Sequence, residues 1–394
     1  MKYDFDQVIC RRNTGSSKWD NVKARVGNGD ALPMWVADTD FPCPQPVIDA
    51  VMERARHPIY GYPYLEPGFY SSTVNWVKRR HGWDIRPEWL VFATGVVPVF
   101  NTLIQAVTEP GDQIIIQKPV YHPFINVVGD NRRVVSSNSL IYSEGRYTMD
   151  FEDLERRAAD PKAKVMIFSS PHNPVGRVWT EDELARVAEI CYRNQVILIS
   201  DEIHSDLIFE GHRHIPTASI NEEWAQNIIT CYAPSKTFNT AGLRGSGIVV
   251  PNEALRQKLQ EQFTANRSIQ QNIFALPAYI AAYSGDCDDY LEQLLCYLQA
   301  NIDYLDGYLR EHMPKIKLVK PEATYLTWLD CTELRICGDE LAKFFIDDCL
   351  VAINRGTMFG EEEGSHFARL NIGCPRATLT EGLERIRKEY DKRW

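Results

Sequence analysis

Short apolar runs alternate with amphipathic stretches along most of this chain. Four runs are rich in β-branched residues and bounded by turn residues: 113–119, 164–171, 196–202 and 227–235. Each is typical of a strand buried on both faces of a parallel sheet. The stretch 180–194 has helical periodicity, with Thr180 as the N-cap and Glu183 completing a capping box. This alternation predicts an α/β fold with a central mixed, mostly parallel sheet.

The pattern changes after about residue 285. A long helical stretch at 288–313 is followed by a strand-like run at 323–330, a helix near 338–350, a second strand-like run at 369–375 and a final helix. This order is typical of a smaller α+β unit. We therefore expect three parts: an N-terminal segment, 1–45, packing with the small domain; a large domain, 46–285; and the small domain, 286–394.

Composition and charge narrow the classes of partner. Hydrophobic residues make up 44% and charged residues 24%, as in ordinary globular proteins. The net charge of −10 disfavours nucleic acid and anionic membranes as partners. The sequence has no apolar run long enough for a membrane span, no signal-like apolar core near its start and no CxxC pair among its ten cysteines. We therefore expect a cytoplasmic protein with reduced cysteines and no metal site.

Three unlike polar residues follow three of the predicted strands. Asn173, Asp201 and Lys236 come after the runs at 164–171, 196–202 and 227–235, or at their ends. Ligands of open α/β sheets bind beyond the carboxyl ends of the strands. An amide, a carboxylate and a lysine at one edge are what pyridoxal phosphate (PLP) chemistry needs. Lys236 would form the Schiff base, Asp201 would pair with the pyridine nitrogen and Asn173 would donate to the phenolic oxygen.

Two further features suit the same cofactor. The stretch 93–107 begins with a glycine-containing turn that opens a helix, whose free N–H groups and dipole suit a phosphate. Tyr121 follows another predicted strand and could stack on the cofactor ring. Each residue alone also has an ordinary explanation: a helix-capping Asp201, a turn at Asn173, a solvated Lys236 or a packing Tyr121. Their order and spacing along one sheet favour the functional interpretation.

The chain also resembles a known family, the fold-type I PLP enzymes, and within it the MalY/PatB group of cystathionine β-lyases and related C–S lyases. The most specific segments are "SDEIHSDLIF" (200–209) and "APSKTFNTAGL" (233–243). Others run along the whole chain, among them "MWVADTDFPCP" (34–44), "YGYP" (60–63), "TGVVP" (94–98), "PVYHPF" (119–124), "SSPHNPVGRVWT" (169–180), "ATYLTWLD" (323–330) and "RLNIGCPR" (369–376).

The resemblance implies roles for individual residues. Lys236 is similar to the Schiff-base lysine, Asp201 to the pyridinium partner, Asn173 to the donor to the phenolic oxygen and Tyr121 to the stacking tyrosine. The phosphate cradle would comprise Gly95, Val96, Ser235 and Arg244. Arg369 resembles the arginine that grips the substrate α-carboxylate, and Ala37 would line the substrate site. Tyr62 resembles a tyrosine that reaches the phosphate of the neighbouring subunit, which implies a homodimer.

The implied activity is α,β-elimination from L-cystathionine or a related cysteine thioether, giving a thiol, pyruvate and ammonia. The sequence departs from the group at Thr39, where a bulkier apolar residue is usual. It also departs at Arg244, eight residues after Lys236, where many aminotransferases have a phosphate-binding arginine. Two alternatives stay open: an aminotransferase, since one fold serves both reactions, and a regulatory protein on the same fold.

Overall fold

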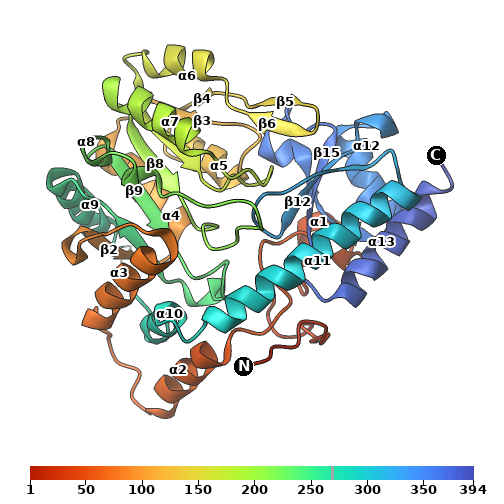
Figure 1. Ribbon diagram of the computed structural model, residues 1–394, viewed down its shortest axis with the longest axis horizontal. Coiled ribbons are helices and arrows are strands. Elements are labelled where there is room, and N and C mark those ends of the chain that lie inside the picture. Colours follow the sequence, from red (N-terminus) through yellow and green to blue (C-terminus); the bar gives the residue numbers. More distant parts are fainter. Residues whose placement is uncertain (268–269) are drawn as a thin grey trace.

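A seven-stranded sheet forms the centre of the molecule in a computed structural model that describes residues 1–267 and 270–394 (Figure 1). All neighbouring strands are parallel except that β10 runs antiparallel to both β2 and β9. The predicted mixed, mostly parallel sheet is therefore confirmed. Its strands, in spatial order, are β2 (Leu90–Ala93), β10 (Ser246–Val249), β9 (Ile228–Tyr232), β8 (Ile197–Asp201), β7 (Ala163–Ser169), β3 (Gln113–Ile116) and β4 (Val134–Ser137).

The central strands are apolar because helices cover both faces of the sheet. Successive side chains of a strand point to opposite faces. In β7, Val165 and Ile167 belong to one buried cluster, while Met166 and Phe168 belong to the other. One face packs against α4 (Val96–Val107), α5 (His122–Asp130) and α9 (Glu253–Asn266). The other packs against α3 (Pro67–His81), α6 (Phe151–Ala158), α7 (Glu181–Arg193) and α10 (Ala275–Tyr283).

The predicted start of α7 is confirmed by its capping box. The Thr180 hydroxyl accepts a hydrogen bond from the N–H of Glu183 at 3.2 Å, and the Glu183 carboxylate accepts one from the N–H of Thr180 at 2.8 Å. These bonds satisfy two N–H groups that would otherwise lack partners at the helix start. The helix therefore begins where the sequence places it, directly after the turn that carries Asn173.

A second, antiparallel sheet lies toward the carboxyl terminus. Its order is β11 (Lys317–Val319), β12 (Leu326–Asp330), β15 (Phe367–Asn371) and β14 (Asn354–Arg355). Figure 1 shows α11 (Asp288–His312) and α13 (Arg376–Tyr390) running beside it, with α12 (Gly338–Lys343) next to β15. A π-helical turn (Phe344–Asp348) follows α12 directly. No helix within the described ranges is both long and apolar enough to cross a membrane.

The N-terminal segment reaches both sheets. β1 (Leu32–Pro33) pairs in parallel with β13 (Val351–Ala352), close in sequence to β14. The short α1 (Val22–Val26) precedes β1, and α2 (Gln45–Arg56) follows it and contacts α10. Two small elements complete the fold, a hairpin of β5 (Ile141–Ser143) and β6 (Arg146–Thr148), and α8 (Glu222–Ala225). The course of residues 30–44 between the sheets positions the site described next.

Candidate active site

Three strands of the large sheet bring the candidate residues to one edge. Ser169 at the end of β7 lies opposite Asp201 at the end of β8, and Asp201 lies opposite Cys231 in β9. Asn173 and Lys236 follow in the turns after β7 and β9. Asn173, Asp201, Lys236 and Tyr121 line one narrow cavity, and Ala37 of the N-terminal segment lines it too. The structure therefore brings these five predicted residues together.

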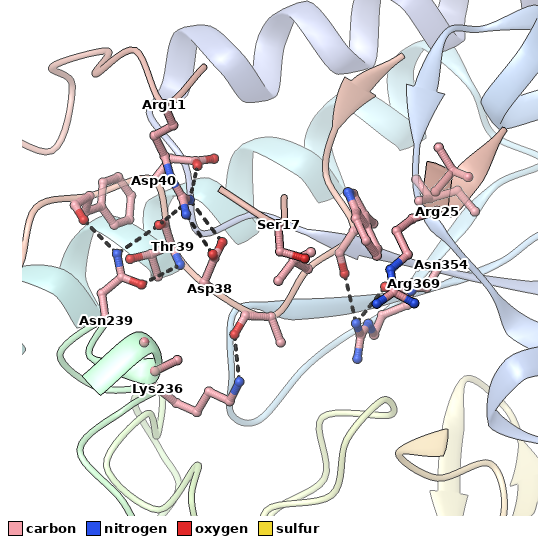
Figure 2. A pocket seen from close by; sticks show the side chains of 18 of the residues that line it. Arg11, Ser17, Arg25, Asp38, Thr39, Asp40, Lys236, Asn239, Asn354 and Arg369 are labelled. Carbon is pink, nitrogen blue, oxygen red and sulfur yellow. Dashed lines mark hydrogen bonds and ion pairs between the residues drawn. The ribbon is translucent and has the colours of Figure 1, made fainter. Parts of the chain in front are cut away.

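Lys236 reaches across the cavity to the N-terminal segment. Its Nζ donates a hydrogen bond to the carbonyl oxygen of Ala37 at 2.8 Å (Figure 2). Burial, reinforced by the positive charge of Arg369, lowers the pKa of Lys236 to about 8. A lysine with this pKa is partly neutral near physiological pH, so its nitrogen can act as a nucleophile or as a base.

Asp201 is a buried carboxylate without a cationic partner in contact. Within the described part of the chain, no basic side chain lies within ion-pair distance of it. Among the described residues, its carboxylate accepts one hydrogen bond, a long one of 3.3 Å from the N–H of Ile203. Burial raises the pKa of Asp201 to about 7. A cation placed against this carboxylate would restore its charged form, and a protonated ring nitrogen is such a group.

A second hollow of about 280 Å³ adjoins Lys236 at the start of α4. Gly95 caps that helix with a φ of 113°, a conformation that favours glycine, and no side chain caps the helix start. The free N–H groups of the first turn suit an anion. Of the predicted residues, Gly95, Val96, Ser235 and Arg244 line this hollow together with Tyr121, Asp201 and Lys236.

Arg244 supplies a positive charge to the same hollow. Its side chain is exposed, and in residues 1–267 and 270–394 it makes no ion pair or hydrogen bond. Its own φ of 55° lies in the left-handed region. A free guanidinium beside uncapped N–H groups fits a phosphate in both charge and donor number.

Arg369 in β15 is a buried cation, and its hydrogen-bond acceptors among the described residues are all neutral. Its side chain donates to the Oδ1 atoms of Asn173 (3.0 Å) and Asn354 (2.6 Å) and to the carbonyl oxygen of Trp35 (3.0 Å) (Figure 2). Its guanidinium lies over the ring of Phe359, and its Nε is buried without a hydrogen-bond partner. Burial lowers the pKa of Arg369 to about 10, so the group is still charged at neutral pH.

Arg369, Trp35 and Asn354 line a larger cavity of about 1100 Å³. Lys236, Ala37 and Tyr121 line the same cavity. Arg369 is in position to bind an anion there, because its guanidinium is already oriented by three acceptors and no carboxylate in the described ranges neutralises it. A bidentate carboxylate is the ligand that such a guanidinium suits best.

The segment that carries Ala37 is fastened on both sides. Arg11 donates to Asp38 at 2.8 Å and to Asp40 at 2.7 Å, and the buried Lys18 donates to Asp40 at 2.7 Å. The Nδ2 of Asn239, three residues after Lys236, donates to the carbonyl oxygens of Thr39 and Phe41, and Asn371 of β15 donates to that of Asp38. The Ala37 carbonyl is therefore fixed relative to both sheets.

Several residues of the site were not predicted from the sequence. Trp35 of the N-terminal segment and Asn354 of the neighbouring strand β14 orient Arg369, and neither was given a role from the sequence. His204 was more accessible to prediction, since it lies three residues after Asp201 in the same conspicuous segment. It is buried in the narrow cavity with an unpartnered Nδ1, and burial lowers its pKa well below the usual value.

Tyr62 lies apart from all these residues. Its side chain is fully exposed, at 103% of the reference area, and it lines none of the three cavities described above. The segment around it also exposes Ile59, Tyr60 and Tyr64. A role for Tyr62 at the site of its own chain has no support from this position, whereas the role predicted at a neighbouring subunit is compatible with it.

The large mixed sheet, the small antiparallel sheet and the placement of Lys236 and Asp201 at one edge of the large sheet are typical of the fold-type I class of PLP-dependent transferase folds. The chain belongs to the family Aminotransferase class I and II, which matches residues 35–386. The family and fold predicted from the sequence are therefore confirmed.

Named relatives narrow the class. Cystathionine beta-lyase PatB of Bacillus subtilis (strain 168) is 41% identical over 384 residues, covering 98% of this chain and 99% of PatB. Protein MalY of Escherichia coli (strain K12) is 33% identical, with 97% of each chain covered. The crystal structure of cystalysin from Treponema denticola, which contains a pyridoxal 5′-phosphate cofactor, matches with a TM-score of 0.95 at 34% identity, covering 100% of both chains.

Proposed function

We propose that this protein is a PLP-dependent C–S β-lyase that cleaves L-cystathionine or a related cysteine thioether to a thiol, pyruvate and ammonia. The carrying observation is that Lys236, Asp201 and Arg369 line two cavities that share Ala37, Tyr121 and Lys236 in their walls. The chain is also similar to cystathionine β-lyase PatB over 98% of its length. A base, a partner for a ring cation and a receptor for a carboxylate are the protein groups that this reaction needs.

The residues present fit the cofactor. Asp201 would face the ring nitrogen, and Tyr121 would pack on the ring. The Nδ2 of Asn173 would donate to the phenolic oxygen, since its Oδ1 already accepts from Arg369. The hollow lined by Gly95, Val96, Ser235 and Arg244 would hold the phosphate. When bound, PLP supplies an electron sink for the negative charge that forms at Cα.

The chain itself binds the substrate and moves its proton. Arg369 would bind the α-carboxylate, and this contact would hold Cα in the cavity beside Lys236 and Ala37. The pKa of Lys236, lowered to about 8, leaves a neutral fraction of its amine that can accept the Cα proton. Because the carbonyl of Ala37 accepts from Lys236 Nζ, it holds that nitrogen at a defined place in the cavity.

An aminotransferase is the second candidate. Arg244 favours it, since a phosphate-binding arginine at this spacing from Lys236 is common among aminotransferases. In the structure Arg244 lines the hollow assigned to the phosphate. A contact there would anchor the cofactor whichever reaction follows, so Arg244 does not decide between the two.

The assembly that we propose is a cytoplasmic homodimer. An exposed segment with Ile59, Tyr60, Tyr62 and Tyr64 presents apolar surface that a second copy would cover. Tyr62 would then reach the phosphate hollow of the neighbouring subunit. This supports the interpretation of the "YGYP" segment made from the sequence.

The decisive experiment is incubation of the holoenzyme with L-cystathionine without any keto acid, followed by a pyruvate assay. Pyruvate should form with the wild type and not with Lys236→Ala, which should also lose the yellow colour of the bound cofactor. A parallel reaction with 2-oxoglutarate measures amino-group transfer. Transfer that clearly outpaces pyruvate release across several thioethers would overturn the lyase assignment in favour of the aminotransferase.

A further inference from the structure

Of the basic side chains in the wall of the larger cavity that the proposed reaction does not use, one has no carboxylate partner among the described residues. Six basic side chains line it: Arg11, Arg25, Lys236, Arg244, Arg355 and Arg369. Arg11 is paired with Asp38 and Asp40, and Arg355 is paired with the exposed Asp339 at 2.9 Å. Lys236, Arg244 and Arg369 have roles toward the cofactor and the α-carboxylate. Arg25 has none.

Arg25 is a free guanidinium on an anchored support. Across residues 1–267 and 270–394 it makes no ion pair and no hydrogen bond. It lies in α1, whose Val22 is buried in a small cluster with Ala31 and Ala352, against which Val26 and Trp35 pack. The position of its backbone is therefore fixed although its side chain is exposed.

The support of Arg25 also carries the groups that orient Arg369. The carbonyl oxygen of Trp35 accepts a hydrogen bond from Arg369, and Ala352 lies two residues before Asn354, the other acceptor. Figure 2 shows Arg25, Asn354 and Arg369 on one side of the pocket, with Lys236 and Asp38 drawn toward the other. Arg25 is thus a second cation that lines the same cavity as Arg369, the proposed receptor of the α-carboxylate.

The size of the cavity leaves room for a substituent beyond a cysteine. The volume of about 1100 Å³ is slightly above the usual range for small-molecule sites, about 300–1,000 Å³, and a cysteine side chain needs only a small part of it. If the sulfur carried a substituent with a terminal carboxylate, the substituent would occupy this space and its carboxylate could pair with Arg25. A guanidinium suits that partner, because it donates two parallel hydrogen bonds to a carboxylate.

Resting on the proposed function, we propose that Arg25 forms a distal subsite that selects S-substituted cysteines carrying a carboxylate on the leaving thiol. Thioethers with the same chain length but no distal charge bind without this contact. The contact is electrostatic, and the Arg25 guanidinium is exposed to solvent. The preference for the charged substrate should therefore weaken as ionic strength rises.

A matched pair of substrates tests the subsite. S-(3-carboxypropyl)-L-cysteine and S-butyl-L-cysteine have equally long substituents and differ in the terminal carboxylate. Arg25→Gln should lower kcat/KM for the first about tenfold, the size expected for losing one charge-assisted hydrogen bond, and leave the second within about twofold. Arg25→Lys should retain part of the preference. Lys23→Gln is the control, since Lys23 lies in the same helix outside the cavity wall.

The outcomes separate the alternatives. Equal losses with both substrates would show that Arg25 only supports the fold, and no change with either would show that it is a solvated surface residue. If Lys23→Gln had the same effect as Arg25→Gln, the preference would come from the general surface charge and not from a contact with Arg25. Each of these results overturns the subsite.

A binding measurement keeps the subsite testable if the lyase activity fails. L-2-Aminosuberate and L-2-aminooctanoate are the corresponding pair without sulfur, and their binding can be followed by calorimetry on the cofactor-loaded protein. The wild type should bind aminosuberate more tightly, and Arg25→Gln should remove that difference. Equal binding of the two by the wild type contradicts the subsite, whereas absence of pyruvate with both thioethers contradicts only the proposed reaction.

Discussion

At the scale of single residues, Asp201 lowers the stability of the cofactor-free fold near neutral pH, because its buried carboxylate has no cationic partner in contact among the described residues. The same feature suits its proposed role as the partner of the ring nitrogen. Its pKa is raised to about 7 by burial, so the folded state favours the protonated form. In the unfolded chain its pKa is about 4, so the contribution of this group to stability is full below about pH 4 and is lost as the pH rises to about 7. Because burial disfavours the charged form of this carboxylate, a cation that binds beside it gains a partner that no described side chain already occupies.

Asp201→Asn should therefore change activity and stability in opposite directions. The neutral amide cannot hold a ring nitrogen protonated, so kcat should fall at least ~10²-fold. The cofactor-free variant should unfold at a higher temperature than the cofactor-free wild type at pH 8, with a smaller difference at pH 5. Thermal unfolding at both pH values, together with the pyruvate assay, measures both effects. A variant with a near-normal rate would show that another group protonates the ring.

Arg369 is the second residue whose environment predicts a specific defect. Arg369→Ala removes the receptor for the α-carboxylate, so mainly KM should rise. The loss should be about 2–5 kcal/mol, as for truncating one side of a buried charge pair. Steady-state kinetics with a thioether and with its analogue lacking the α-carboxylate provide the comparison. If the analogue loses affinity to the same degree, Arg369 does not contact that carboxylate.

At the scale of elements, the start of α4 is the part that we expect to recognise the phosphate. Gly95 has a φ of 113° and no side chain within the hollow, so Gly95→Ala both strains the backbone and places a methyl group near the free N–H groups. The affinity for PLP should fall at least about tenfold, while the affinity for pyridoxal, which lacks the phosphate, should change little. Reconstitution of the cofactor-free protein with each compound measures this.

A matched glycine separates strain from recognition. Gly211 also has a positive φ, 87°, but lies in an exposed turn away from the site with open space around it. Gly211→Ala should cost a similar amount of stability without changing the affinity for PLP. If both variants lose PLP affinity equally, the start of α4 has no special part in phosphate binding.

The elements also show how far the sequence could predict the structure. Runs of β-branched residues located β3, β7, β8 and β9, and a capping box located the start of α7, because these signals are local. The antiparallel β10 was not predicted, since four residues beginning Ser246–Gly247 carry no clear periodicity. Asn173, Asp201 and Lys236 could be placed together because strand ends share an edge. The contacts of Arg369 with Trp35 and Asn354 could not be predicted, because Trp35 is 334 residues away and the strand of Asn354 has only two residues and no periodicity.

At the scale of the whole molecule, the exposed Tyr62 predicts that activity depends on pairing of two chains. A Tyr62→Ala chain and a Lys236→Ala chain should each be nearly inactive alone. Mixed after unfolding and refolding, they should form hybrid dimers in which one site has both residues. About a quarter of the wild-type activity should then return if half of the dimers are hybrids with one intact site each. Hybrids that form without recovered activity would place Tyr62 outside the neighbouring site.

The fastened N-terminal segment has a consequence for where this chain can be cut. The family match begins at residue 35, after Arg11 and Lys18. A chain shortened to that boundary would keep every residue that we assign to the cofactor and the α-carboxylate, but it would lose Arg25. It would also leave Asp40, which is only 5% exposed in the full chain, with neither of its cations. Removing the partners of a buried charge typically costs about 3–5 kcal/mol. The span of the family match is thus shorter than the span that keeps Asp40 paired, so a chain cut at the family boundary should fold less stably than the full chain.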